Sequence, residues 1–243
     1  MVPAGLSSVV LINPSRSHQP KQRSAAMRIG ILGAGSMADA LGTRWAGAGH
    51  DVMVGARDAA KAGALAERIG AGAKSGSLRD AADFGGVVLL ALPTASVPEA
   101  LAAAGAAEGA LRGKPLIDCT NPLAPGTLTP APLGGASTAE YIANGTGAGV
   151  VKAFNLCAAE VWRMPSPVFG GRPLAVPLCG DEEDALAVVR RLVDDLGCTP
   201  VDGGGLAKAG LLEGTAVFVI GLWFGGVDAQ AIVPPLESAF GAG

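Results

Sequence analysis

Apolar residues recur along the chain in short runs that alternate with segments of helical spacing. The runs that predict strands cover 28–32, 50–54, a short stretch near Ala73, 86–92, 115–119, 149–154, 174–179 and 199–201. The segments that predict helices cover 38–48, 59–69, 77–83, 96–104, 137–144 and 182–196. Regular alternation of strand and helix is typical of a mostly parallel sheet with right-handed crossovers.

The predicted fold class is therefore α/β, a Rossmann-type doubly wound sheet followed by a smaller C-terminal α/β lobe. Charged residues make up 16% of the 243 residues and hydrophobic residues 49%, which suits a sheet buried on both faces. We expect a flexible N-terminal extension at 1–26, an NAD(P)-binding Rossmann domain at 27–157 and the smaller lobe at 158–243. A chain that began at Met27 would keep this fold intact.

The turn after the first strand carries the first functional signal. It reads Gly33-Ala34-Gly35-Ser36-Met37-Ala38, and of the several G-x-G matches only this one follows a clear strand and opens a helix. A pyrophosphate must lie against backbone N–H groups at a helix N-terminus, and a Cβ on either glycine would hold it off. We expect Ala38 to keep the helix close to the strand. The turn predicts a dinucleotide site that includes Gly33, Gly35, Ser36, Met37 and Ala38.

The end of the second strand indicates which dinucleotide binds. NAD-specific chains usually place Asp or Glu there, whereas this strand ends in Gly55-Ala56-Arg57-Asp58. We expect Gly55 and Ala56 to leave room, Arg57 to bind a phosphate and Lys61 to add a second positive charge. The pattern favours NADP(H). In the alternative, Arg57 is a solvated loop residue and Lys61 an exposed helix residue, while Asp58 fits as the N-cap of helix 59–69.

Three later strands end in residues that fall on the same edge of the sheet. Ligands of doubly wound sheets lie beyond the carboxyl ends of the strands. We therefore expect a bound cofactor near Leu92 and Pro93 and near Asn121 and Pro122, although the prolines can equally serve to end strands. Lys152 and Asn155 lie at the end of the next strand and are candidates for contact with the second substrate. Their alternatives are a snorkelling lysine and a turn-forming asparagine.

Acid–base residues are scarce, and we predict no catalytic side chain and no metal site. His18 lies in the extension, and His50 is expected to be solvated at a helix-to-strand turn. The single tyrosine, Tyr141, has no lysine four residues later, and four cysteines without C-x-x-C spacing indicate buried, reduced thiols. Hydride transfer between a nicotinamide and a flavin-like ring tolerates this scarcity, because the protein need only align the two rings.

Charge and hydropathy limit the partners. The net charge is −3, and residues 27–243 hold 15 basic and 21 acidic groups, which argues against nucleic acid. No secretion signal is evident at the N-terminus, so we expect a cytoplasmic protein. The apolar segment 215–226 is shorter than a membrane span requires, and a buried helix or a subunit interface is expected there instead.

Six segments together carry a family resemblance. MRIGILGAGSMADAL, GHDVMVGARD, VVLLALP, LIDCTNPL, VVKAFN and PLCGDEEDALAVVRRLVDDLGCTPVDGGGL, within about 27–225, resemble the NADPH-dependent reductases of the deazaflavin coenzyme F420. The resemblance implies a homodimer, NADP in the Gly33 turn and the Arg57 loop, and a second ring near 151–156. Authentic deazaflavin reductases resemble G-x-T-G-x-L-G in the first turn, and this chain differs there.

The sequence thus predicts an NADP(H)-dependent oxidoreductase that transfers hydride to or from coenzyme F420 or a flavin-type acceptor, a small molecule in either case. Two alternatives stay open. One is an imine reductase of the pyrroline-5-carboxylate type, although such enzymes usually carry a longer helical lobe, while this chain has strand signals at Leu174 and Thr199. The other is a sensor protein that binds NADPH without turnover.

Overall fold

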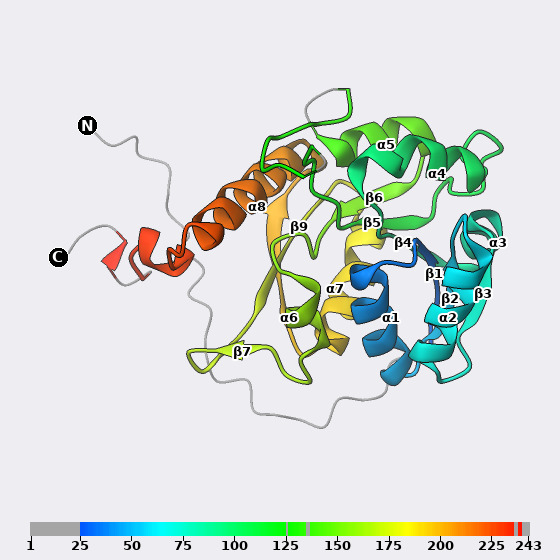
Figure 1. Cartoon of the computed structure of the whole chain (residues 1–243), viewed down its shortest axis with the longest axis horizontal. Coiled ribbons are helices and arrows are strands. Elements are labelled where there is room, and N and C mark those ends of the chain that lie inside the picture. Colours follow the sequence, from blue (N-terminus) through cyan, green and yellow to red (C-terminus); the bar gives the residue numbers. More distant parts are fainter. Residues whose placement is uncertain (1–24, 125, 135–136, 236–237, 240–243) are drawn as a thin grey trace.

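The computed structural model is built on one mixed sheet between two layers of helices (Figure 1). It describes residues 25–124, 126–134, 137–235 and 238–239. The sheet has eight strands in the described residues, in the order β10-β9-β6-β5-β4-β1-β2-β3. Its strands are β1 (Arg28–Leu32), β2 (Asp51–Gly55), β3 (Lys74–Gly76), β4 (Val87–Leu90), β5 (Pro115–Asp118), β6 (Gly149–Lys152), β9 (Ala175–Gly180) and β10 (Thr199–Gly204). A separate hairpin pairs β7 (Val168–Phe169) with β8 (Arg172–Pro173).

Helices cover both faces of the sheet, as the sequence predicts for a doubly wound fold. One hydrophobic cluster packs against α1 (Ser36–Gly47), α2 (Ala59–Ile69), α6 (Ala159–Arg163) and α7 (Glu183–Asp195). The cluster on the other face packs against α3 (Leu78–Phe84), α4 (Val97–Ala103), α5 (Thr138–Thr146) and the start of α8 (Ala209–Phe224). The remaining elements are short 3-10 turns at Thr94–Ser96, Leu206–Lys208 and Ala229–Ile232.

The C-terminal part of the chain extends the same sheet. β9 pairs antiparallel with β6, and β10 then pairs parallel with β9, whereas the other pairs of the sheet are parallel. The two strands that the sequence places in a smaller lobe are therefore part of the Rossmann sheet, with β9 hydrogen-bonded to β6 and β10 at the edge. The domain boundary at 157 stays a prediction, and most of the expected extension, 1–24, lies outside the described residues.

Local signals place most elements within a few residues of their observed ends. Helix α2 occupies the predicted 59–69, and the Asp58 carboxylate accepts the backbone N–H groups of Ala60 and Lys61 at 3.0 and 3.2 Å. The strand expected at 149–154 ends at Lys152 instead. Phe154 has a φ of 61°, which is incompatible with a continuing strand, and its ring stacks edge-on against Trp45 and Trp162.

His50 is buried, so the expectation that it is solvated is wrong. Its Nδ1 accepts the backbone N–H of Met27 at 3.1 Å, so Nε2 is the nitrogen that donates to Asp195 Oδ2, at 3.0 Å. Met27 precedes β1 and Asp195 ends α7. The imidazole thus joins three segments and has a structural role.

Helix α8 projects from one end of the sheet (Figure 1) and exposes much of its apolar surface. With the preceding 3-10 turn it forms a helical stretch, Leu206–Phe224, that is long and apolar enough to cross a membrane by length and composition; 22% of it is buried. The sequence predicts a segment too short for a span, whereas the helical stretch in the structure is long enough. Helices of this length and composition also occur in soluble proteins. The alternative of a buried helix is wrong, because Phe218, Trp223 and Phe224 are exposed.

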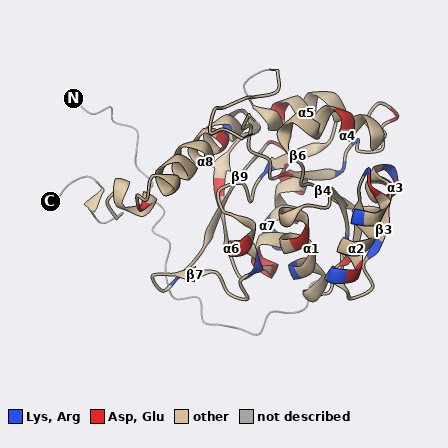
Figure 2. Ribbon diagram, in the orientation of Figure 1, with Lys and Arg blue, Asp and Glu red and all other residues tan. Residues whose placement is uncertain are grey.

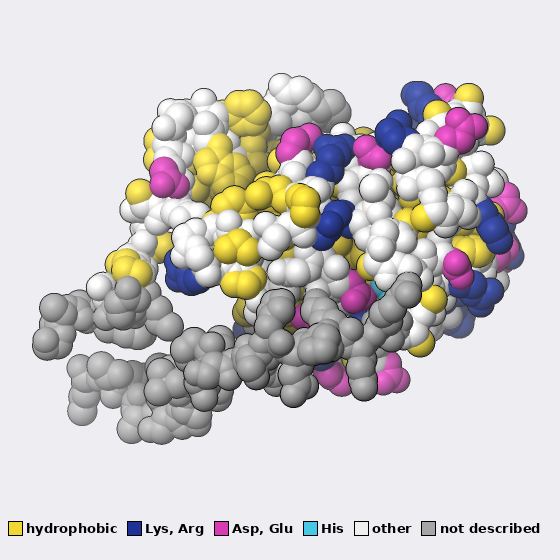
Figure 3. All heavy atoms as spheres, turned by 90° about the horizontal axis from the view of Figure 1, so that it is seen from below, with side chains coloured by type: hydrophobic (Ala, Val, Ile, Leu, Met, Phe, Trp, Pro, Cys, Tyr) yellow, Lys and Arg dark blue, Asp and Glu magenta, His cyan; other side chains and the backbone are white. Residues whose placement is uncertain are grey.

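Charged and hydrophobic side chains are distributed unevenly. Figure 2 shows few charges on α8 and more of them on α2 and α3. Figure 3 shows hydrophobic side chains gathered at the end of the molecule that carries α8.

Candidate functional site

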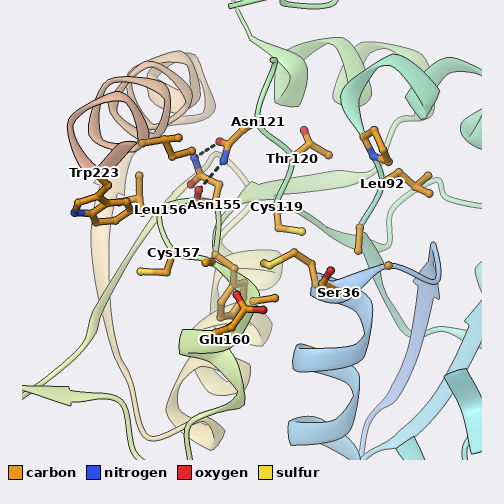
Figure 4. Close-up of a pocket in the computed structure, with 18 of the residues that line it drawn as sticks. Ser36, Leu92, Cys119, Thr120, Asn121, Asn155, Leu156, Cys157, Glu160 and Trp223 are labelled. Carbon is orange, nitrogen blue, oxygen red and sulfur yellow. Dashed lines mark hydrogen bonds between the residues drawn. The ribbon is translucent and has the colours of Figure 1, made fainter. Parts of the chain in front are cut away.

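A cavity of about 810 Å³ opens at the carboxyl ends of β1, β4, β5 and β6, between α1, α6 and α8 (Figure 4). This is the edge at which a doubly wound sheet binds ligands. The lining comes from five parts of the chain: Gly35, Ser36 and Met37; Ala91, Leu92 and Pro93; Cys119, Thr120 and Asn121; 154–160; and Ile220, Trp223 and Phe224.

The turn into α1 has the geometry that an anion requires. The first N–H groups of any helix lack intrahelical acceptors, and here the N-cap residue is Gly35 and no side chain caps them, so they are available to a ligand. A Cβ built on Gly35 would meet nothing within 4 Å, and the residue lines the cavity. A side chain at this position would therefore occupy space that a ligand can use.

Gly33 and Ala38 have structural roles at the same turn. Gly33 has a φ of +126°, and a Cβ there would lie 2.3 Å from the carbonyl oxygen of Ala91. Only glycine permits this approach of the β1 turn to the end of β4. Ala38 is fully buried in the hydrophobic cluster beneath α1, as expected for a residue that keeps the helix close to the strand.

Arg57 lies in the loop after β2, outside the cavity lining. Its guanidinium donates to the carboxylate of Glu99 on α4 over 2.8 Å, and both side chains are exposed. Lys61 is exposed as well, 3.9 Å from the Asp58 carboxylate. Gly55, in contrast, does not leave room for a ligand: a Cβ there would lie 2.6 Å from the Ser77 carbonyl oxygen, so α3 fills that space.

Asn121 and Asn155 hold two cavity loops together. The Asn121 side chain donates to the Asn155 carbonyl oxygen at 2.8 Å, and the Asn155 side chain donates back to Asn121 Oδ1 at 3.0 Å (Figure 4). Asn155 also donates to the carbonyl oxygen of Leu212 on α8 at 3.1 Å. Both side chains therefore position the wall. Pro122 follows Asn121 and does not line the cavity.

Lys152 lies behind the cavity wall in a buried ionic cluster. Its ammonium donates to Asp118 Oδ2 at 2.9 Å, to Glu213 Oε1 at 2.8 Å and to the Thr120 carbonyl oxygen at 2.6 Å. The carboxylates are satisfied in turn, because Asp118 accepts the N–H of Thr120 and Glu213 accepts that of Thr138. The cluster joins β5, β6, α5 and α8.

The cluster also determines the charge of Lys152 and of its neighbour Cys119. Burial lowers the pKa of Lys152, but the carboxylates of Asp118 and Glu213 outweigh that effect and hold the pKa above its usual value. Burial, reinforced by the charge of Asp118, raises the pKa of the Cys119 thiol to about 12. The lysine is therefore charged and the thiol neutral at neutral pH.

The four cysteines carry free thiols, as expected. Cys119, Cys179 and Cys198 are buried, while Cys157 is partly exposed at the cavity. No group of three or more metal-ligating side chains occurs in the part of the chain that the structure describes.

The cavity brings seven predicted site residues together: Gly35, Ser36, Met37, Leu92, Pro93, Asn121 and Asn155. Gly33, Ala38, Arg57, Lys61, Pro122 and Lys152 lie outside its lining. Sequence reasoning missed Glu160 on α6 and the three α8 residues Ile220, Trp223 and Phe224. Only the high hydropathy of α8 marked that segment, and hydropathy does not tell a cavity wall from a core helix.

Comparisons with known proteins agree with the predicted family. A family model described as "NADP oxidoreductase coenzyme F420-dependent" matches residues 28–122. The F420-dependent NADP reductase of Methanothermobacter marburgensis is 30% identical over 213 residues, which cover 81% of this chain and 92% of the relative. A solved structure from Arthrobacter sp. FB24, assigned as an F420-dependent NADP reductase, superposes with a TM-score of 0.74 at 28% identity and covers 83% of this chain and 96% of its own.

Two further matches extend the comparison. Metalloreductase STEAP3 of Rattus norvegicus is 31% identical over 211 residues, which are 86% of this chain but only 40% of that protein. The chain therefore spans less than half of the rat protein. The imine reductase of a Pseudomonas species superposes with a TM-score of 0.61 at 18% identity, covering 83% of this chain and 62% of its own, which shows a shared fold.

We expect Lys152→Met to destabilise the fold by about 3–5 kcal/mol, because two buried carboxylates then face each other without a cation. The loss should be smaller at pH 5 than at pH 8, since protonation of one carboxylate relieves the repulsion. Denaturant unfolding of the parent and the variant at pH 5 and pH 8 measures this loss in the free energy of unfolding. Lys61→Met, an exposed control, should stay within about 0.5 kcal/mol of the parent. A loss similar to that of the control, or equal at both pH values, would contradict this account of the cluster.

Proposed function

Because the chain belongs to the family of coenzyme F420-dependent NADP oxidoreductases, we propose that it transfers hydride between NADP(H) and a deazaflavin or flavin-type acceptor. It is an NADP-dependent oxidoreductase of this family, and the acceptor is the new part of the proposal. The observation that carries it is one continuous cavity that runs from the uncapped start of α1 to the aromatic end of α8.

The residues at one end of the cavity fit the cofactor. The free N–H groups at Ser36 and Met37 would hold the pyrophosphate, with the open space beside Gly35 admitting it. Arg57, past the end of β2, would bind the 2′-phosphate, for which its guanidinium offers paired donors. Leu92 and Pro93 would then lie beside the middle of the cofactor. When bound, the nicotinamide supplies the hydride.

The other end of the cavity suits a flat acceptor. Leu156, Ile220 and Trp223 give it apolar and aromatic walls, and Glu160 is the one charged side chain among the described lining residues. That carboxylate is exposed and paired with Arg163. Hydride transfer between two rings requires alignment and little proton movement from side chains, so a wall of this composition is sufficient.

We also propose that a second copy of the chain covers the exposed face of α8, since the resemblance implies a homodimer. Leu211 and Phe218 lie on that face with 69% and 59% of their surface exposed. Large exposed apolar patches mark interaction surfaces. Light scattering on the purified protein should give twice the mass of the chain, and Phe218→Asp should give the monomer. A monomeric parent protein at micromolar concentration would overturn this proposal.

The test of the function follows nicotinamide absorbance after NADPH or NADH is mixed with oxidised coenzyme F420 or with a simple flavin. We expect rapid oxidation of NADPH, and slower oxidation of NADH, with at least one of these acceptors. Tight NADPH binding without turnover of either acceptor would contradict the proposed reaction and favour a sensor.

Arg57→Ala should weaken NADPH binding by about 1.5–3 kcal/mol, the value of a hydrogen bond to a charged group, and barely change NADH binding. Fluorescence titration of both nucleotides measures this. Gly35→Val provides the comparison: it should abolish binding of both nucleotides and leave the thermal unfolding transition intact, since its Cβ meets no neighbour. Equal losses for NADPH and NADH in Arg57→Ala would refute the assignment of the phosphate to Arg57.

A further inference from the structure

The contact between Arg57 and Glu99 joins two segments that flank the proposed place of the adenosine ribose. Arg57 follows β2, and Glu99 lies in the first turn of α4, shortly after the cavity residues Leu92 and Pro93. Arg57 Nη1 donates to Glu99 Oε2 over 2.8 Å. The ion pair is solvated, with 66% and 72% of the two side chains exposed.

Glu99 therefore occupies one of the guanidinium donors that the 2′-phosphate would use. Exposed ion pairs are weak, so a phosphate that takes the guanidinium in a paired geometry can displace the carboxylate. The displaced carboxylate stays close to Arg57, because α4 is packed into the core through Val97, Ala100 and Leu101 and cannot move away. It then lies near the phosphate bound to Arg57 and repels it, because both groups are negatively charged and Glu99 has lost its cation.

The Glu99 carboxylate should affect the binding of NADH differently from that of NADPH. A 2′-hydroxyl carries no charge and does not compete for the guanidinium. Glu and Asp side chains in NAD-specific enzymes accept hydrogen bonds from this hydroxyl. A carboxylate within 2.8 Å of Arg57 thus opposes the phosphate and tolerates or assists the hydroxyl.

We propose that Glu99 is a specificity-determining residue, which holds Arg57 in the free enzyme and reduces the preference for NADPH over NADH. The inference rests on the proposed function, in which Arg57 receives the 2′-phosphate. The sequence did not single out Glu99, because it lies 42 residues from Arg57 and carries no motif.

The test measures dissociation constants of NADPH and NADH for the parent, Glu99→Gln and Glu108→Gln by fluorescence titration. Glu99→Gln keeps the shape of the side chain and removes its charge. We expect NADPH to bind about two- to fivefold more tightly, the range of an exposed ion pair, with NADH unchanged or weaker. The gain should shrink at high ionic strength, since both groups are solvated.

Glu108→Gln is the matched control, because Glu108 is an exposed carboxylate that pairs with Arg79 at 4.0 Å and has no contact with Arg57. It should leave both constants unchanged. In an Arg57→Ala background, Glu99→Gln should produce a smaller gain, because no guanidinium is freed.

Three results separate this inference from the proposed function. NADPH affinity that is unchanged or weaker in Glu99→Gln, while the parent binds NADPH, overturns the role of Glu99 alone. An equal gain for NADPH and NADH overturns it as well, because the effect is then not directed at the phosphate. A parent protein that binds neither nucleotide overturns the proposed function and this inference together.

Discussion

The buried ammonium of Lys152 is the point on which the arrangement of the cavity depends. A charge without solvent requires partners, and the partners here come from the end of β5, from α8 and from the loop after β5. Asp118 and Glu213 can satisfy the lysine only if β5, β6 and α8 keep their relative positions. The cluster therefore attaches an otherwise apolar and exposed helix to the sheet at a defined place.

The position of α8 in turn gives the cavity its second half. Asn155 adds to the attachment by its hydrogen bond to the carbonyl oxygen of Leu212, the residue before Glu213. Farther along the helix, Ile220, Trp223 and Phe224 line the same cavity as the start of α1. The start of α1 and the end of α8 thus line one cavity, and the buried ionic cluster holds α8 in the place where it does so.

Residues whose environment is local could be predicted from the sequence. The Gly33 turn, the helix that follows it and the Asp58 cap depend on neighbours within a few positions, and the structure has all three. The alternation of strands and helices likewise predicted the doubly wound sheet, because each run needs only its own periodicity to be recognised.

Residues whose environment is assembled from distant segments could not be predicted. His50 meets Asp195 across 145 residues, and Lys152 meets Glu213 across 61, so neither burial nor pairing was visible in the sequence. The space beside Gly55 was assigned to a ligand, whereas α3 occupies it. The role of α8 in the cavity wall depends on its direction relative to the sheet, which the ionic cluster fixes.

The central claim is that NADP(H) binds with its pyrophosphate at the start of α1, its nicotinamide in the cavity and its 2′-phosphate at Arg57, beyond the cavity lining. A crystal structure of the protein with NADP⁺ tests it most directly. We predict phosphate oxygens within hydrogen-bond distance of the N–H groups of Ser36 and Met37, the 2′-phosphate on the Arg57 guanidinium, and the nicotinamide between Leu92 and Asn155. A cofactor bound elsewhere, or one whose 2′-phosphate turns away from Arg57, would contradict the account.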